Sequence, residues 1–70
     1  MIVIVANGKP REVADGATIV DFLGSLGWKR EWVVVELNGE PIERARLGER
    51  TLEAGDRLEV VRAVAGGASR

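Results

Sequence analysis

The chain has 70 residues, a formal net charge of −1, and neither cysteine nor histidine. That length fits one small domain with a core of limited size. Without cysteine there is no disulfide framework, thiol nucleophile or thiolate metal site, and without histidine there is no imidazole for acid–base catalysis. A zinc site would have to use carboxylates alone, which is unusual, so no metal site is predicted.

The charged residues are spread along the chain, with 10 Lys and Arg against 11 Asp and Glu. This distribution lacks the basic face that phosphate binding requires, so nucleic acid is not an expected partner. The apolar residues 1–6 are too few for a membrane span of about 20 residues, and they lack the basic start of a secretory signal. We therefore expect no contact with a membrane and a cytoplasmic location.

A β-hairpin is predicted at the beginning of the chain. Residues 2–6, IVIVA, are rich in β-branched side chains, which favour a strand. Asn7-Gly8 is a strong turn signal, because both residues tolerate a positive φ. A second short strand at about residues 11–14 would pair with the first, and Asp15-Gly16 would turn the chain again.

A single amphipathic helix is predicted next. Thr18 is a suitable N-cap, because its hydroxyl can accept a hydrogen bond from the backbone N–H of Asp21. A carboxylate at this third helical position also suits the start of a helix. The apolar face is formed by residues spaced i, i+3, i+4 and i+7, namely Ile19, Phe22, Leu23 and Leu26. Gly27 is placed to end the helix, and Gly24 would weaken its middle while letting a strand approach closely.

Residues 32–38, WVVVELN, predict a third strand, and Asn38-Gly39 marks a turn after it. Successive side chains of a strand point to opposite faces of the sheet. The positions expected to face the core are Val33, Val35 and Leu37. The positions expected on the opposite face are Trp32, Val34, Glu36 and Asn38.

The remainder of the domain is predicted to be an irregular segment followed by a last strand. Residues 40–52 have no clear period, and their expected core residues are Ile42, Leu47 and Leu52. A turn at residues 53–56 leads into the strand at residues 57–64, RLEVVRAV. Its core face would hold Leu58 and Val60, and its opposite face Glu59, Val61 and Ala63.

Trp28 and Trp32 lie on either side of the charged sequence KRE. An exposed tryptophan can anchor a partner protein. The favoured interpretation is that one or both cover the edge of the core.

The predicted order is strand, strand, helix, strand, irregular segment and strand. Because only one helix is present to cover a sheet, this order indicates an α+β domain in which a four- or five-stranded mixed sheet packs on one main helix. That arrangement is the ubiquitin-like β-grasp. We assign this domain to residues 1–65 and a flexible C-terminal tail to residues 66–70, which hold a diglycine and a three-residue extension.

Three stretches of the sequence resemble the ThiS family of sulfur carrier proteins. They are the opening NGKPREVADGATIVDFLGSLG, the central VVVELNGEPIER and the closing LEAGDRLEVVRAVAGG. The resemblance runs from about Met1 to Gly67. It rests on the three stretches taken together and in this order, since Asn-Gly and Gly-Asp turns are common individually. It implies the same ubiquitin-like β-grasp fold. The short chain and the VELNGEPI region favour ThiS over the related MoaD-type molybdopterin carriers.

The resemblance also implies a mechanism. In this family an E1-like adenylyltransferase uses ATP and magnesium (Mg) to adenylate the carboxylate of the last glycine. Sulfur supplied by a sulfurtransferase or cysteine desulfurase then displaces AMP, and the resulting thiocarboxylate passes its sulfur to thiazole synthase. Carried onto this chain, Gly67 is the activated residue, and Gly66, Ala65 and Val64 form the tail that enters the enzyme. The carrier would be a protein co-substrate, not an enzyme, and would bind no cofactor itself.

Glycine suits such a tail, because a residue without Cβ passes through a narrow channel and adopts backbone geometries that other residues avoid. The family's use of the sheet face implies a partner interface that includes Val34, Val61 and Ala63, with Arg62 at its polar rim. The alternative is that the valines reflect ordinary strand propensity and that Arg62 is a solvated charge.

Ala68, Ser69 and Arg70 follow the diglycine, where the family usually ends. An internal Gly67 carbonyl is an amide and cannot be adenylated as a carboxylate can. The extension is interpreted as a propeptide removed by a JAMM-type zinc metalloprotease, as a remnant of an expression vector, or as a sign that carrier function is lost. Alternative functions are a carrier for molybdopterin, cysteine or tRNA thiolation, a ubiquitin-like protein modifier, or a plain interaction domain.

Overall fold

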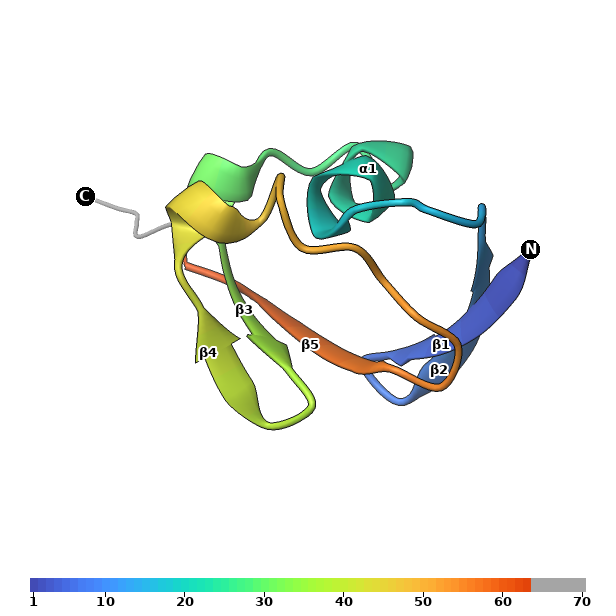
Figure 1. Ribbon diagram of the computed structural model, residues 1–70. Helices are drawn as coiled ribbons and strands as arrows, with labels where there is room; N and C mark the ends of the chain where they lie inside the picture. Colours follow the sequence, from blue (N-terminus) through green and yellow to red (C-terminus); the bar gives the residue numbers. More distant parts are fainter. Residues whose placement is uncertain (64–70) are drawn as a thin grey trace.

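The computed structural model describes residues 1–63, so the predictions for residues 64–70 lie outside the described part of the chain. Five strands form one mixed sheet in the order β2-β1-β5-β3-β4, and helix α1 covers one face of it (Figure 1). The elements are β1 (Ile2–Ala6), β2 (Lys9–Val13), α1 (Ile19–Ser25), β3 (Val33–Leu37), β4 (Glu40–Ile42) and β5 (Arg57–Arg62), with 3-10 helices η1 (Arg30–Trp32) and η2 (Arg44–Arg46). The predicted α+β architecture is confirmed, with five strands.

Strand β5 lies at the centre of the sheet, parallel to β1 and antiparallel to β3. The first hairpin turns at Asn7 and Gly8, whose φ values of 50° and 81° confirm the predicted turn. Because this two-residue turn pairs Ala6 with Lys9 directly, β2 begins two residues earlier than the predicted start at residue 11. Pro10 is compatible with β2 because that strand is at an edge of the sheet.

Both predicted ends of the helix are confirmed. The Thr18 hydroxyl accepts a hydrogen bond from the backbone N–H of Asp21, and the Asp21 carboxylate accepts one from the backbone N–H of Thr18, which completes a capping box. Gly27 has a φ of 76°, and the N–H groups of Gly27 and Trp28 donate to carbonyl groups of the last turn. The close approach expected at Gly24 is wrong, because a Cβ there would have no neighbour within 4 Å.

The core lies between α1 and the helix-facing side of the sheet. Every residue expected there from the alternation of β3 and β5 is buried, as are Ile19, Phe22 and Leu23 from the helix. Among the residues expected from the irregular segment, Leu47 and Leu52 are buried and Ile42 is half-buried. No polar or charged side chain is buried in the described part of the chain.

The irregular segment contains more structure than its sequence indicated. Residues 40–42 form β4, which pairs with β3, and residues 44–46 form η2. A strand of three residues that includes Pro41 is too short to show an alternating pattern. The third strand is also shorter than predicted, because Trp32 belongs to η1 and packs against the core instead of facing outward.

Candidate functional site

The residues assigned to the reaction, Gly67 with Gly66, Ala65 and Val64, lie outside the described residues. The part of the candidate site that the structure describes is therefore the C-terminal end of β5 and the sheet face that surrounds it. We call the sheet face turned away from α1 the outer face.

Three of the four predicted interface residues share this outer face. Val34 and Val61 are direct partners across β3 and β5, and their side chains are 49% and 62% exposed. Ala63 is exposed and follows Val61 by two residues, so the alternation puts it on the same side. Val3 on β1 is 48% exposed and was not singled out from the sequence, although the alternation in residues 2–6 places it on the outer face.

Arg62 lies on the opposite side of the sheet from the other three. Its position alternates with Val61, and its guanidinium carbon is 5.7 Å from the ring centroids of both Trp28 and Trp32. Both tryptophans pack against the core as partly buried residues, which confirms that they cover its edge. No pattern in the sequence indicated that Arg62 would meet them, since contacts between residues 28, 32 and 62 depend on the tertiary fold.

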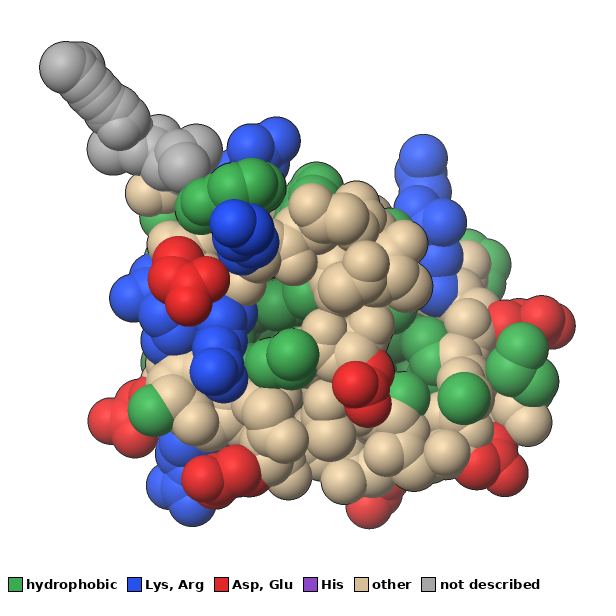
Figure 2. All heavy atoms as spheres, turned by 90° about the horizontal axis from the view of Figure 1, so that it is seen from above, with side chains coloured by type: hydrophobic (Ala, Val, Ile, Leu, Met, Phe, Trp, Pro, Cys, Tyr) green, Lys and Arg blue, Asp and Glu red, His purple; other side chains and the backbone are tan. Residues whose placement is uncertain are grey.

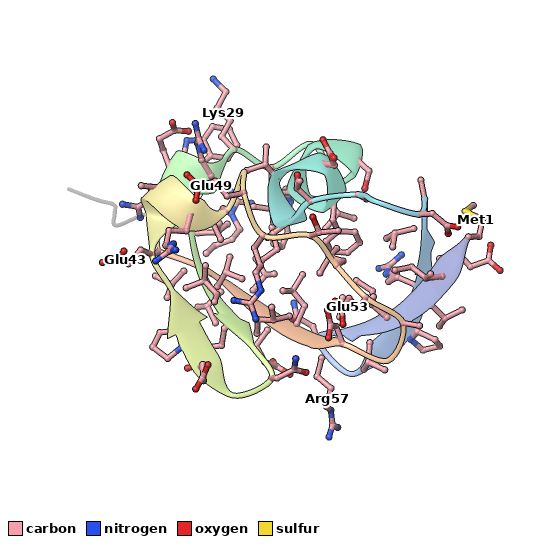
Figure 3. The ribbon with its side chains drawn as sticks, viewed as in Figure 1. Met1, Lys29, Glu43, Glu49, Glu53 and Arg57 are labelled. Atoms are coloured by element: carbon pink, nitrogen blue, oxygen red, sulfur yellow. The ribbon has the colours of Figure 1, made fainter. Side chains whose placement is uncertain are left out.

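The outer face also carries charged side chains. Glu36 and Glu59 are direct partners across β3 and β5, and both are exposed. Arg57 lines the same shallow hollow as these two residues, and Figure 3 shows it pointing away from α1. Among residues 1–63 the one ion pair found joins the N-terminal ammonium group of Met1 to Asp15, so neither glutamate is held in a salt bridge there. Two adjacent carboxylates beside an apolar patch fit a partner surface with basic groups.

Basic side chains gather elsewhere. Figure 2, which views the molecule from the helix side, shows several Lys and Arg side chains, with Asp and Glu side chains among them, at the end that carries η1 and η2. Arg44 has a structural use there, because its Nε donates to the carbonyl oxygen of Arg30 at 3.0 Å.

The described residues offer no catalytic constellation. No group of three or more His, Cys, Asp or Glu side chains within residues 1–63 is arranged to hold a metal ion. In the same part of the chain, no helix has the length and apolar character needed to cross a membrane. The described surface presents an apolar patch, formed by Val34, Val61 and Ala63, beside the end of β5.

The model of the ThiS family matches residues 4–67. The chain belongs to the ThiS family. The match begins within β1, covers the other four strands and the helix, and extends to the second residue of the diglycine.

Solved structures agree with this assignment. The crystal structure of the thiamine biosynthesis protein ThiS from Geobacter metallireducens has a TM-score of 0.79 and 35% sequence identity, and the alignment covers 94% of this chain and 100% of that one. The solution structure of a thiamine biosynthesis protein from the same organism has a TM-score of 0.76 at 35% identity, covering 94% of this chain and 88% of that one. The β-grasp fold of this chain is therefore the fold of its ThiS relatives.

Two curated relatives are much longer proteins, both named thiazole synthase. The one from Magnetococcus marinus is 36% identical over 61 residues, which is 87% of this chain and 19% of the relative. The one from Paramagnetospirillum magneticum is 31% identical over 67 residues, which is 96% of this chain and 21% of the relative. The chain thus spans about a fifth of the length of these relatives.

Proposed function

We propose that this protein is the sulfur carrier for formation of the thiamin thiazole, with the carboxylate of Gly67 as the group that carries the sulfur. The observation that supports this most directly is the family match over residues 4–67, which ends on the second glycine of Gly66-Gly67. The β-grasp fold shared with the Geobacter ThiS structures supports the same role.

The proposed chemistry takes place in the active site of another protein. An E1-like adenylyltransferase joins the Gly67 carboxylate to AMP from ATP, with release of pyrophosphate, and a sulfur nucleophile supplied through a sulfurtransferase or cysteine desulfurase then displaces AMP. Magnesium and ATP belong to the activating enzyme. An acyl-adenylate reacts readily with water, so a narrow tail enclosed by the enzyme protects the intermediate.

The described surface supports the part of this proposal that concerns binding of the partner enzyme. Val34 and Val61 form an apolar patch next to the end of β5, and Ala63 continues it toward the tail. A partner that covers this patch would receive the C-terminal residues at a fixed position. Arg62, on the other side of the sheet, would contact the partner only if the enzyme also encloses the tail from the helix side.

Thiazole synthase is the proposed acceptor of the sulfur. Two proteins that bear this name contain a segment similar to nearly the whole of this chain. A carrier-like segment within the same polypeptide as the synthase supports a pairing of the two activities.

Removal of residues 68–70 is part of the proposal, because Gly67 must have a free carboxylate before it can be adenylated. A JAMM-type protease is the proposed processing enzyme. Within residues 1–63 the buried residues lie between Ile4 and Val60.

The test compares three forms of the chain, ending at Gly66, at Gly67 and at Arg70. Each is incubated with an E1-like adenylyltransferase of a ThiS system, magnesium and ATP, and then examined by intact mass spectrometry. We expect an AMP adduct only on the form that ends at Gly67, and replacement of one oxygen by sulfur when a sulfur donor is added. Absence of any adduct on that form, or equal adducts on all three, would refute the proposal.

A further inference from the structure

Three side chains from separate segments meet at the end of β5. Arg62 is the last residue of that strand, and its guanidinium carbon lies 5.7 Å from the ring centroid of Trp28 and 5.7 Å from that of Trp32. Both distances are within the range of about 6 Å over which a cation is attracted to an aromatic face. The planar guanidinium group of arginine also stacks on aromatic rings, which the ammonium group of lysine does not do. We call these three residues the Arg62 cluster.

Local structure holds both indoles in place. Trp28 follows Gly27 directly. Its backbone N–H donates to the carbonyl oxygen of Leu23 at 3.0 Å, which fixes the Trp28 backbone to the end of α1. Trp32 is the last residue of η1, and its backbone N–H donates to the carbonyl oxygen of Lys29 at 3.0 Å. The Lys29 ammonium nitrogen is 5.5 Å from the Trp32 ring centroid, so a second cation lies near this indole.

The backbone at the end of β5 is hydrogen-bonded next to the Arg62 cluster. The N–H of Ala63 donates to the carbonyl oxygen of Trp32 at 2.8 Å, so Trp32 holds β5 through its backbone as well as its ring. The next residue upstream that a side chain clamps is Val60, whose N–H and carbonyl group bind the side-chain amide of Asn7 at 2.8 and 3.1 Å. The backbone position of residues 61–63 therefore depends on their pairing with the end of β3 and on the Arg62 cluster.

We propose that the Arg62 cluster fixes the point from which residues 64–67 extend into the enzyme that acts on Gly67. This inference rests on the proposed function. Four extended residues span at most about 13–14 Å, so the position of their root determines what Gly67 can reach. If residues 61–63 came loose, they too would have to be ordered on binding, at an entropic cost for each residue. Arg62 is thus a positioning residue that acts through the backbone.

The test uses Arg62→Ala and Arg62→Lys in the chain that ends at Gly67, with Arg57→Ala as the matched control. Arg57 lies on the same strand but points away from the helix side and contacts neither indole (Figure 3). In Arg62→Ala we expect hydrogen exchange of the Ala63 amide to accelerate by about tenfold or more, because the end of β5 opens more often. We expect KM for the carrier in adenylation to rise by about tenfold with kcat within about twofold, since ordering the loosened residues weakens binding.

Arg62→Lys should recover part of both effects, because a lysine keeps the cation but not the planar stacking. Arg57→Ala should leave the hydrogen exchange of the Ala63 amide unchanged, because Arg57 takes no part in the Arg62 cluster. The anchoring role is overturned if Arg62→Ala leaves the exchange of Ala63 unchanged, or if it lowers kcat while KM stays constant. If the unmodified carrier is never adenylated, the proposed function fails, whereas the exchange measurement still decides whether the Arg62 cluster holds the strand. If Arg62→Ala does not fold, the same comparison is made with Trp28→Phe and Arg62→Lys.

Discussion

Asn7 is expected to stabilise the fold well beyond its role in a turn. Its side-chain Oδ1 accepts a hydrogen bond from the N–H of Val60 at 2.8 Å, and its Nδ2 donates to the carbonyl oxygen of Val60 at 3.1 Å. These two bonds connect the first hairpin to the central strand across 53 residues of sequence. The backbone of Asn7 has a φ of 50°, a left-handed conformation that most residues avoid.

Two substitutions separate these contributions. Asn7→Gly keeps the favourable left-handed conformation and loses only the two hydrogen bonds, each worth about 0.5–1.5 kcal/mol, so we expect a loss of about 1–3 kcal/mol. Asn7→Ala loses the same two hydrogen bonds and also replaces asparagine, which tolerates the left-handed region, with a residue that does not, which adds about 1–2 kcal/mol. The free energy of unfolding of a domain of this length is on the order of 4–10 kcal/mol, so either change is a large part of the total.

Both variants are measured by urea and thermal unfolding, with tryptophan fluorescence as the signal. A loss of 1 kcal/mol lowers Tm by about 4–8 °C in a domain of this size, so Asn7→Gly should lower it by at least that amount. Asn38→Gly is the control, because Asn38 also has a positive φ, but the two hydrogen bonds of its side chain, to Asp56 and Arg57, are exposed to solvent. A loss below about 0.5 kcal/mol in Asn7→Gly, or one equal to that of Asn38→Gly, would refute the reasoning.

The remaining predictions also concern the free energy of unfolding. Gly24→Ala should stabilise the helix by about 0.5–1 kcal/mol, because a Cβ there meets open space, whereas Gly27→Ala should destabilise it by about 1–2 kcal/mol, because Gly27 has a φ of 76°. A change in Tm of the same sign in both variants would contradict this. Leu58→Ala removes a fully buried side chain and should lower stability in urea by about 2–5 kcal/mol, and a loss under about 1 kcal/mol would mean that the site collapses. Glu36→Gln should stabilise the free protein by about 0.2–1 kcal/mol by relieving repulsion from Glu59, and the gain should disappear when Glu59→Gln is already present.

Local patterns in the sequence predicted most of the secondary structure. The apolar spacing of α1, its cap at Thr18 and its end at Gly27 each depend on residues within one or two turns of each other. The turn at Asn7-Gly8 is similarly local. The prediction failed for β4, because three residues around Pro41 form a strand only when β3 is there to pair with them.

The sequence determined the family and the order of the helix and of every strand except β4, because both are recorded in the linear pattern of apolar residues, turns and the closing Gly66-Gly67. The tertiary structure alone decided which separate positions meet. It brought Val34 opposite Val61 on the outer face and placed Arg62 against Trp28 and Trp32 on the other. The physical reason is that strand register and the packing of α1 on the sheet set these contacts, and neither is fixed by residues close together in the chain.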